Sequence, residues 1–326
     1  MLSELQQLIS SAVKENEPLA GHTTYRIGGS ADYFFAATTS DEAIKALHVA
    51  KELGLSYFIL GGGSNVLVSD EGFHGLLIKM ANRGIEFAGT KIKIEAGTPT
   101  ALVALKSVEA GLTGFEWAVG LPGTIGGAIR GNAGMFGGDT GQVIETVRCI
   151  RNGEPEQLTH EQCAFGYRDS LFKHQSGCVI LSAVLALETA SDLAASQQQL
   201  QAILAHKKDQ QPIEYPTAGC IFKNWLPSEP EDLISIRQSL DLDSGEEIPV
   251  TPNGTVPAGW IIDRAQLKGT KVGGAMISEK HANFFINSSG ASASDVIGLI
   301  AVVKTRVRNI TRSVIHLQEE IEYLGF

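Results

Sequence analysis

The sequence lacks several features that would place it in common protein classes. Its uninterrupted apolar stretches, such as residues 299–303, are much too short to cross a bilayer. Its N-terminus has neither a basic segment nor an apolar one, so we expect no signal peptide. Its 4 cysteines show no Cys-x-x-Cys spacing, which favours reduced thiols over a disulfide framework. We therefore expect a cytoplasmic protein that does not enter a membrane.

Charge and metal-ligand patterns exclude further functions. The chain has 26 basic and 36 acidic residues, giving a net charge of −10. That balance is unlike a protein that binds nucleic acid by neutralising phosphates, although a local basic pocket for an anionic substrate stays compatible with it. The histidines are scattered without the spacing of metal ligands, so we predict no metal site.

The common nucleotide-binding fingerprints are absent as well. There is no Gly-x-x-x-x-Gly-Lys-Ser/Thr motif, which argues against a P-loop phosphotransferase. Gly61 and Gly63 form a Gly-x-Gly pair, but the third glycine of a dinucleotide fingerprint is missing. The strand-like residues 66–68 follow where a helix should begin, so a Rossmann unit is not expected.

The chain does contain two glycine-rich runs, at residues 61–65 and 120–134. No side chain at 120–128 is charged, so a large polar ligand could lie directly against main-chain N–H groups there. Two such runs suggest an extended diphosphate ligand, such as a dinucleotide. For either run alone, a tight turn is an equally good interpretation.

Hydrophobic periodicity and turn residues predict a mixed α+β chain. Ser40 is a candidate N-cap, with Asp41 and Glu42 at the favourable end of a helix that Gly54 would stop. The predicted strands are 31–36, 56–60, 76–79, 91–95, 146–151, 178–188, 219–222 and 281–287. The predicted helices are 40–53, 100–110, 192–208, 257–267 and 291–311. A domain boundary near 210–212 follows from the polar helix that ends there.

Six segments in order resemble the UDP-N-acetylenolpyruvoylglucosamine reductase (MurB) family. They are 23–29 (TTYRIGG), 61–73 (GGGSNVLVSDEGF), 120–134, 167–170 (YRDS), 218–224 (AGCIFKN) and 273–284 (GGAMISEKHANF). The resemblance runs from about Pro18 to the C-terminus. It implies NADPH-dependent reduction of UDP-N-acetylglucosamine enolpyruvate to UDP-N-acetylmuramate through FAD, in peptidoglycan precursor synthesis.

The resemblance also implies an architecture. It predicts a two-part FAD-binding domain of the vanillyl-alcohol-oxidase (PCMH) type at 18–209, with subdomains of about 18–80 and 81–209. A smaller α+β substrate-binding domain would occupy 210–326, and an N-terminal helix 1–17. The segment 226–257 is longer than usual and rich in Pro, Asp and Glu, so we predict an exposed loop there. The short stretch between Arg168 and Cys220 favours the family subclass without an extra tyrosine loop. We also expect the protein to be a monomer.

Family membership would assign the cofactor contacts to both glycine runs. The implied FAD-binding residues are Gly61, Gly62, Gly63, Ser64, Asn65, Gly120, Pro122, Gly123, Thr124, Gly126, Gly127, Asn132, Ala133 and Gly134. Arg130-Gly131 stands before Asn132 where the family commonly has methionine, which could change some of these contacts.

The implied reaction adds hydride to the β-carbon of the enolpyruvyl group and a proton to its α-carbon. Arg168 matches the family arginine that would hold the developing enediolate, since a guanidinium can bind a carboxylate through two parallel bonds. The alternative is a surface arginine paired with Asp169. Cys220 stands where the family usually has the serine that donates the proton, and a thiol is a stronger acid than a hydroxyl. The alternative is a buried structural thiol.

The third implied catalytic residue is Glu320, from the pattern Leu317-Gln318-Glu319-Glu320-Ile321, acting with Arg168 at the α-carbon and carboxylate. Glu319 and Glu322 are close competitors, and such a cluster usually forms a solvated face. The implied substrate-binding residues are Tyr167, Lys223, Asn224 and His281, although a lone histidine is more often structural. Trp225 replaces a proline that usually follows Asn224 in the family.

Two other functions compete with this interpretation. Another oxidase or dehydrogenase on the same FAD-binding scaffold would leave Cys220 and Glu320 without a role. A flavin-binding protein without turnover would not need Arg168, Cys220 and Glu320 together.

Overall fold

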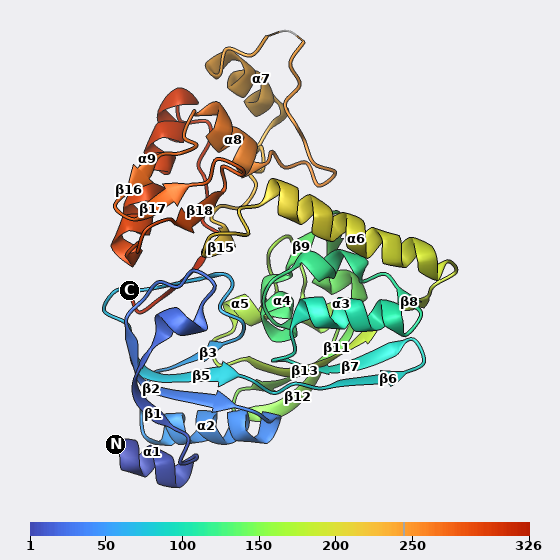
Figure 1. Cartoon of the computed structure of the whole chain (residues 1–326), viewed down its shortest axis with the longest axis vertical. Helices are drawn as coiled ribbons and strands as arrows, with labels where there is room; N and C mark the ends of the chain where they lie inside the picture. Colours follow the sequence, from blue (N-terminus) through green and yellow to red (C-terminus); the bar gives the residue numbers. More distant parts are fainter. Residues whose placement is uncertain (244) are drawn as a thin grey trace. The chain divides into compact units, whose positions relative to one another are not determined.

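The chain divides into two compact units in the computed structural model, which describes residues 1–243 and 245–326 (Figure 1). Unit 1 consists of Met1–Glu17, Ser30–Gly63 and Phe73–Asp209. Unit 2 consists of Pro18–Gly29, Ser64–Gly72 and Gln210–Phe326. The two early segments of unit 2 are not part of the linear division at residue 210 that the sequence suggests.

Unit 1 begins with the short helix α1 (Leu2–Leu8), so the helix predicted over 1–17 was too long, and a strand starts at Lys14. A four-stranded sheet follows. Its strands, in spatial order, are β1 (Lys14–Pro18), β2 (Ser30–Ala37), β5 (Phe73–Met80) and β3 (Tyr57–Leu60). Both β2 and β3 pair with β5 in parallel. Helix α2 (Ser40–Glu52) connects β2 to β3 and contacts β2 and β5 (Figure 1). The helix is capped one residue earlier than predicted, because the Thr39 side chain accepts the N–H of Glu42 at 3.1 Å.

The second sheet of unit 1 has five antiparallel strands. They are β12 (Glu154–Thr159), β11 (Ile144–Arg151), β13 (Val179–Ala186), β7 (Lys91–Glu95) and β6 (Ile85–Ala88), in that order. The helices of this part are α3 (Thr100–Glu109), α4 (Ile125–Gly131), α5 (Leu171–His174) and α6 (Leu193–Gln210). Short strand pairs join β8 (Leu112–Thr113) to β14 (Glu188–Thr189) and β9 (Gly134–Met135) to β10 (Gly138–Asp139).

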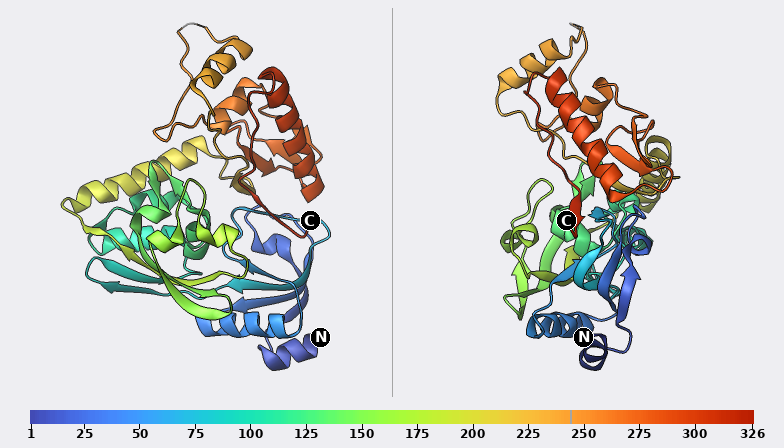
Figure 2. Two further views of the ribbon diagram at one scale, coloured as in Figure 1. Left: turned by 180° about the vertical axis from the view of Figure 1, so that it is seen from behind. Right: turned by 90° about the vertical axis from the view of Figure 1, so that its left-hand side faces the viewer.

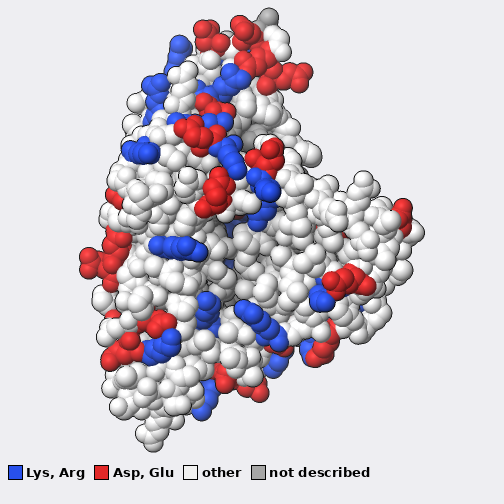
Figure 3. Space-filling model, viewed as in Figure 1, with Lys and Arg blue, Asp and Glu red and all other residues white. Residues whose placement is uncertain are grey.

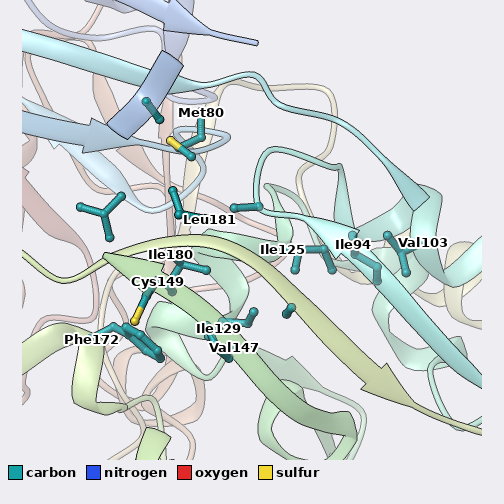
Figure 4. Packing of buried hydrophobic residues seen from close by; sticks show 14 of the residues in the cluster. Met80, Ile94, Val103, Ile125, Ile129, Val147, Cys149, Phe172, Ile180 and Leu181 are labelled. Carbon is teal, nitrogen blue, oxygen red and sulfur yellow. The ribbon is translucent and has the colours of Figure 1, made fainter. Parts of the chain in front are cut away.

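One continuous hydrophobic core joins the two sheets of unit 1. Members from the first sheet, such as Ile78, belong to the same cluster as Ile94 and Val147 of the second sheet. Ile125 and Ile129, which lie on α4, belong to it as well, and Figure 4 shows them among the labelled members. The core therefore fixes α4, and with it the second glycine run, against the second sheet.

Unit 2 is built on a four-stranded antiparallel sheet. Its strands, in order, are β15 (Thr217–Cys220), β18 (Phe284–Asn287), β17 (Ala275–Ile277) and β16 (Lys271–Val272). The other elements are β4 (Val66–Val68), α7 (Pro230–Ser239), α8 (Ala258–Arg264), α9 (Ala293–Ile310) and β19 (Glu322–Leu324). Helix α9 contacts β16 and β17 and is the long helix at the C-terminal end of the colour scale in Figure 2. Close to the chain end, β19 pairs in parallel with β4.

The segment 226–257 differs from the exposed loop that its composition predicts. It contains helix α7, and residue 244 of the segment lies outside the described residues. The Asp232 carboxylate accepts the N–H groups of Ser228 and Glu229 at 2.8 and 3.2 Å and so caps this helix. Ile236 is fully buried in the core of unit 2. The sequence contains this signal, because Leu233, Ile236 and Leu240 have the spacing of one helical face.

Surface charge and helix hydropathy do not indicate a further function. On the face shown in Figure 3, acidic and basic side chains are interspersed rather than separated by sign. Among the described residues, none of the helices is both long enough and apolar enough to cross a bilayer.

Candidate functional site

The two glycine runs of the sequence lie against each other in unit 1. A Cβ added at Gly62 would lie only 2.5 Å from the Cα of Gly123, and one added at Gly61 would lie 2.6 Å from the Thr124 hydroxyl oxygen. Because only glycine lets two backbones approach so closely, both runs need their glycines at this crossing. The chain leaves unit 1 directly after Gly63, so Ser64 and Asn65 belong to unit 2.

This crossing fits the diphosphate of FAD. Gly63 and Gly123 have φ values of 64° and 103°, in the region that glycine adopts without strain. The Thr124 hydroxyl is buried and has no hydrogen-bond partner within the described part of the chain, so a donor or acceptor is available there. Gly127 is exposed nearby and has space around its Cα. Uncharged main-chain groups and a buried hydroxyl are suitable partners for a phosphate held by backbone amides.

Other predicted cofactor residues have structural contacts in unit 1. The Gly126 N–H donates to the Ala96 carbonyl at 2.9 Å, and an added Cβ there would lie 3.0 Å from the Ala96 side chain. The Gly120 carbonyl accepts a bond from Lys207 Nζ at 2.7 Å. Ala133 donates its N–H to the Ala128 carbonyl at 2.8 Å. Pro122 is exposed at the second run.

Replacing Gly62 with alanine is expected to weaken FAD binding by about 10- to 100-fold, since overpacking typically costs about 1–3 kcal/mol. The new methyl group would meet the backbone of Gly123, which cannot move without displacing the second run. Titration of the apoprotein with FAD measures the effect. Gly131→Ala is the matched control, because nothing lies within 4 Å of its added Cβ. An unchanged FAD affinity in Gly62→Ala would contradict the placement of the cofactor at this crossing.

Arg168 lies in a tight turn of unit 1 beside the second run. Gly166 and Asp169 exchange main-chain hydrogen bonds at 3.0 and 3.2 Å, and Arg168 between them has a φ of 53°. Non-glycine residues in this region are uncommon and cluster at functional sites. The half-buried Arg168 donates from Nη2 to the Gly134 carbonyl at 2.7 Å, and its guanidinium lies 5.4 Å from the exposed Tyr167 ring. The Asp169 carboxylate accepts a bond from His174 at 2.7 Å.

Asn132 connects the second run to this turn. Its side chain donates from Nδ2 to the Gly166 carbonyl at 2.8 Å and accepts the Gly141 N–H at 2.8 Å. Asn132 is 4% exposed and has the left-handed φ of 40° at the C-terminus of α4. The sequence predicts a cofactor contact for Asn132, whereas the structure shows two bonds from its side chain to the protein main chain.

Unit 2 brings the segments that carry Cys220 and Glu320 side by side through their main chains. The Glu320 N–H donates to the Ile221 carbonyl at 2.7 Å, and the Lys223 N–H donates to the Gln318 carbonyl at 2.9 Å. The two segments therefore run antiparallel beside each other, although they are far apart in the sequence. Cys220 and Glu320 are both half-buried.

Asn283 holds the segment that carries Cys220, a role for which the sequence contains no specific signal. Its side chain accepts the Phe222 N–H at 3.0 Å and donates to the Phe222 carbonyl at 2.8 Å. Its own carbonyl accepts the Ile221 N–H at 2.9 Å. Asn283 is 2% exposed, so these bonds are shielded from water. Only its place in the motif GGAMISEKHANF pointed to it.

The predicted substrate-binding residues of unit 2 have defined surroundings. Asn224 accepts the Ala258 N–H at 3.3 Å, and the half-buried Lys223 follows directly after Phe222. His281 Nδ1 accepts the Asn283 N–H at 3.2 Å, so the proton of its neutral ring is on Nε2. Burial lowers the pKa of His281, which keeps the ring uncharged near neutral pH. The ring packs on Phe284 at 4.8 Å. His281 can therefore donate one hydrogen bond but is a poor source of protons.

The predicted catalytic set is divided between the units, with Arg168 in unit 1 and Cys220 and Glu320 in unit 2. Within the described ranges, no group of three or more His, Cys, Asp or Glu side chains is placed to hold a metal ion.

Comparisons with protein families match both parts of the chain. Residues 31–154 match an FAD-binding domain, and residues 211–324 match the C-terminal domain of UDP-N-acetylenolpyruvoylglucosamine reductase. The reductase of that name from Bacillus subtilis is 35% identical over all of this chain and 98% of its own length. The one from Carboxydothermus hydrogenoformans is 36% identical over 99% of this chain and 97% of its own.

Solved structures show the same likeness. UDP-N-acetylenolpyruvylglucosamine reductase from Thermus caldophilus aligns with a TM-score of 0.75 and 28% identity, covering 95% of this chain and 98% of that one. A variant of the BBE-like 1 protein from Physcomitrella patens aligns with a TM-score of 0.56 at 12% identity, which shows a shared fold alone; it covers 95% of this chain and 88% of that one. The predicted α+β fold, with an FAD-binding domain of the vanillyl-alcohol-oxidase (PCMH) type, is confirmed.

Proposed function

This chain belongs to the UDP-N-acetylenolpyruvoylglucosamine reductase family, and we propose that Cys220, Glu320 and Arg168 carry the reaction for which that family is named. The protein is an FAD-dependent oxidoreductase that reduces UDP-N-acetylglucosamine enolpyruvate to UDP-N-acetylmuramate, with NADPH as the reductant. When bound, FAD supplies the hydride chemistry that amino-acid side chains lack.

The residues of the chain handle the charge and the proton. Addition of hydride to the β-carbon places negative charge on the α-carbon and its carboxylate. We assign the guanidinium of Arg168 to that carboxylate, because its two parallel N–H donors match the two oxygens. We assign the thiol of Cys220 to the α-carbon, to which it transfers its proton; the thiolate that remains takes a proton from solvent afterwards. We place Glu320 with Arg168 at the same end of the substrate.

The observation that most supports this assignment is the main-chain pairing of the two segments that carry Cys220 and Glu320. The N–H of Glu320 and the carbonyl of Ile221 are 2.7 Å apart, so the residues of the two motifs are next to each other in unit 2. Two groups that act on one α-carbon must be close together. We further propose that Tyr167, Lys223, Asn224 and His281 contact the substrate. We also propose that the two glycine runs bind FAD without the side chains of Asn65 and Asn132, which bond to the protein main chain.

The neighbours of Glu320 provide an internal test. Glu319 forms an ion pair with Lys304 at 2.8 Å, which gives that carboxylate a structural role. We expect Glu320→Gln to lower kcat by about 10²-fold or more, in the range for a positioned acid–base group. Glu319→Gln should leave kcat near that of the wild type, because an exposed ion pair contributes only about 0–1 kcal/mol. Steady-state rates of NADPH oxidation with the enolpyruvyl substrate measure both. If Glu319 were essential and Glu320 dispensable, the catalytic glutamate would be Glu319, one position earlier in the motif.

The subclass without an extra tyrosine loop, the monomeric state and the cytoplasmic location stay predictions.

A further inference from the structure

The first glycine run ends in an asparagine whose side chain is used inside unit 2. Asn65 donates from Nδ2 to the main-chain carbonyl of Glu320 at 2.9 Å. Its own main-chain carbonyl accepts the N–H of Glu322 at 2.9 Å. These two bonds bracket Ile321, which is 4% exposed. Asn65 thus bonds to the residues on both sides of the buried Ile321.

The result is that both main-chain polar groups of Glu320 are held. Its N–H is bound by the Ile221 carbonyl at 2.7 Å, and its C=O is bound by the side chain of Asn65. Beyond it, β19 continues in parallel register with β4, starting with Glu322 opposite Val66. The position of the Glu320 main chain is therefore fixed relative to Ile221, the neighbour of Cys220, by one bond and relative to Asn65 by the other.

The second glycine run contains a similar contact within unit 1. Asn132 donates from Nδ2 to the Gly166 carbonyl at 2.8 Å, and Gly166 closes the turn that holds Arg168. In both runs, an asparagine amide donates to a main-chain carbonyl of a segment with a proposed catalytic residue. A side-chain amide in this role fixes the main chain without bringing a charge into the site.

We propose that Asn65 and Asn132 are positioning residues that hold Glu320 and Arg168 in place from the two glycine runs. The proposal builds on the assignment of Glu320 and Arg168 given above. Its physical basis is that a displacement of a reacting group by about 1 Å can cost about 10²-fold in rate. Loss of the Asn65 donor removes the bond to the Glu320 carbonyl but leaves the main-chain bond to Glu322, so β19 can keep its pairing with β4.

The test separates the two halves of the reaction. In Asn65→Asp the side chain keeps its size but turns an acceptor toward the Glu320 carbonyl. We expect anaerobic reoxidation of the flavin by the enolpyruvyl substrate to slow by about 10- to 100-fold. Reduction of the flavin by NADPH, and the affinity of the apoprotein for FAD, should stay within about twofold of the wild type. Asn132→Asp should give the same pattern.

Controls separate positioning from a general loss of stability. Ser292→Ala removes the N-cap of α9, where the serine side chain accepts the Asp295 N–H at 3.0 Å, and is expected to cost about 1 kcal/mol of stability without changing either half-reaction. Asn65→Ala, which removes the donor without adding a charge, serves if Asn65→Asp does not fold. When Glu320 is already Gln, changing Asn65 should slow reoxidation by no more than about another twofold, because the two act as a unit.

Hydrogen exchange in the apoprotein gives a readout without turnover. The amide of Glu320 should exchange faster in Asn65→Asp, while amides in α9 keep their protection. Reoxidation at the wild-type rate in Asn65→Asp would overturn the proposal. So would a large loss of FAD affinity with both half-reactions slowed, since Asn65 would then be a cofactor ligand. If Glu320→Gln alone reoxidises normally, the catalytic assignment of Glu320 fails, whereas unchanged exchange at Glu320 refutes the positioning role of Asn65 independently.

Discussion

Replacing Cys220 with alanine is expected to lower turnover by about 10²- to 10⁴-fold, the range for loss of a general acid. The reduction of bound FAD by NADPH should continue, because Cys220 has no part in that step. A thiol is a stronger acid than a hydroxyl, which suits it to proton donation. Stopped-flow absorbance at the flavin band measures both steps on the same sample.

Two variants make this result specific. Cys220→Ser should retain turnover, because its hydroxyl keeps a proton at the same place. Cys178→Ala removes another partly exposed thiol, on unit 1, and should have no effect on either step. Unimpaired turnover in Cys220→Ala would refute the assignment of the proton donor, and so would complete loss in Cys178→Ala.

Replacing Arg168 with alanine is expected to lower the rate of substrate reduction by about 10²- to 10³-fold, as for other groups that stabilise developing charge. Arg168→Lys should recover only part of this loss. Lysine keeps the charge but is a point donor, whereas the guanidinium offers two parallel bonds to the carboxylate. Because the charge develops in the transition state, we expect the loss mainly in kcat rather than in KM.

Backbone strain needs its own control in this experiment. Arg168 has a φ of 53°, and Arg312 in unit 2 has a φ of 50°. Arg312→Ala and Arg312→Lys therefore impose a comparable change at a comparable backbone angle, and both should leave the kinetics unchanged. If Arg168→Ala lost only as much activity as Arg312→Ala, the guanidinium would have no special role.

Local signals predicted much of the fold. The helix predicted at 291–311 is observed as Ala293–Ile310, and the strand predicted at 91–95 is observed as Lys91–Glu95. Periodicity and turn residues act over a few positions, so they report on such elements directly. Helix α7 has the same kind of signal, but the Pro, Asp and Glu content of the whole segment 226–257 predicts a loop instead.

Pairings between distant segments could not be predicted from the residues alone. Asn65 and Glu320 are hydrogen-bonded although they lie 255 positions apart in the sequence. Nothing in the composition of either segment indicates that it contacts the other. The assignment of Ser64–Gly72 to unit 2 has the same origin, because β4 pairs with β19 near the C-terminus. Such contacts depend on the whole packed core, which no short window of sequence encodes.

In the candidate site too, the sequence indicates the chemical groups but not the residues that hold them in place. The motifs identified Cys220, Arg168 and Glu320 as chemical groups, because their residue types suit the reaction. The residues that hold them, Asn283 above all, have ordinary polar side chains whose role depends only on what lies opposite. Buried amides that bond to main chain become recognisable only in the folded molecule.

The most direct test of the proposed reaction is an anaerobic absorbance experiment on the purified protein with bound FAD. NADPH is added first, and UDP-N-acetylglucosamine enolpyruvate second, while the flavin band is recorded. We expect NADPH to bleach the band and the enolpyruvyl substrate to restore it, with one UDP-N-acetylmuramate formed per flavin. Bleaching without recovery would contradict the proposed substrate chemistry, and a protein that does not take up FAD at all would contradict the placement of the cofactor at the two glycine runs.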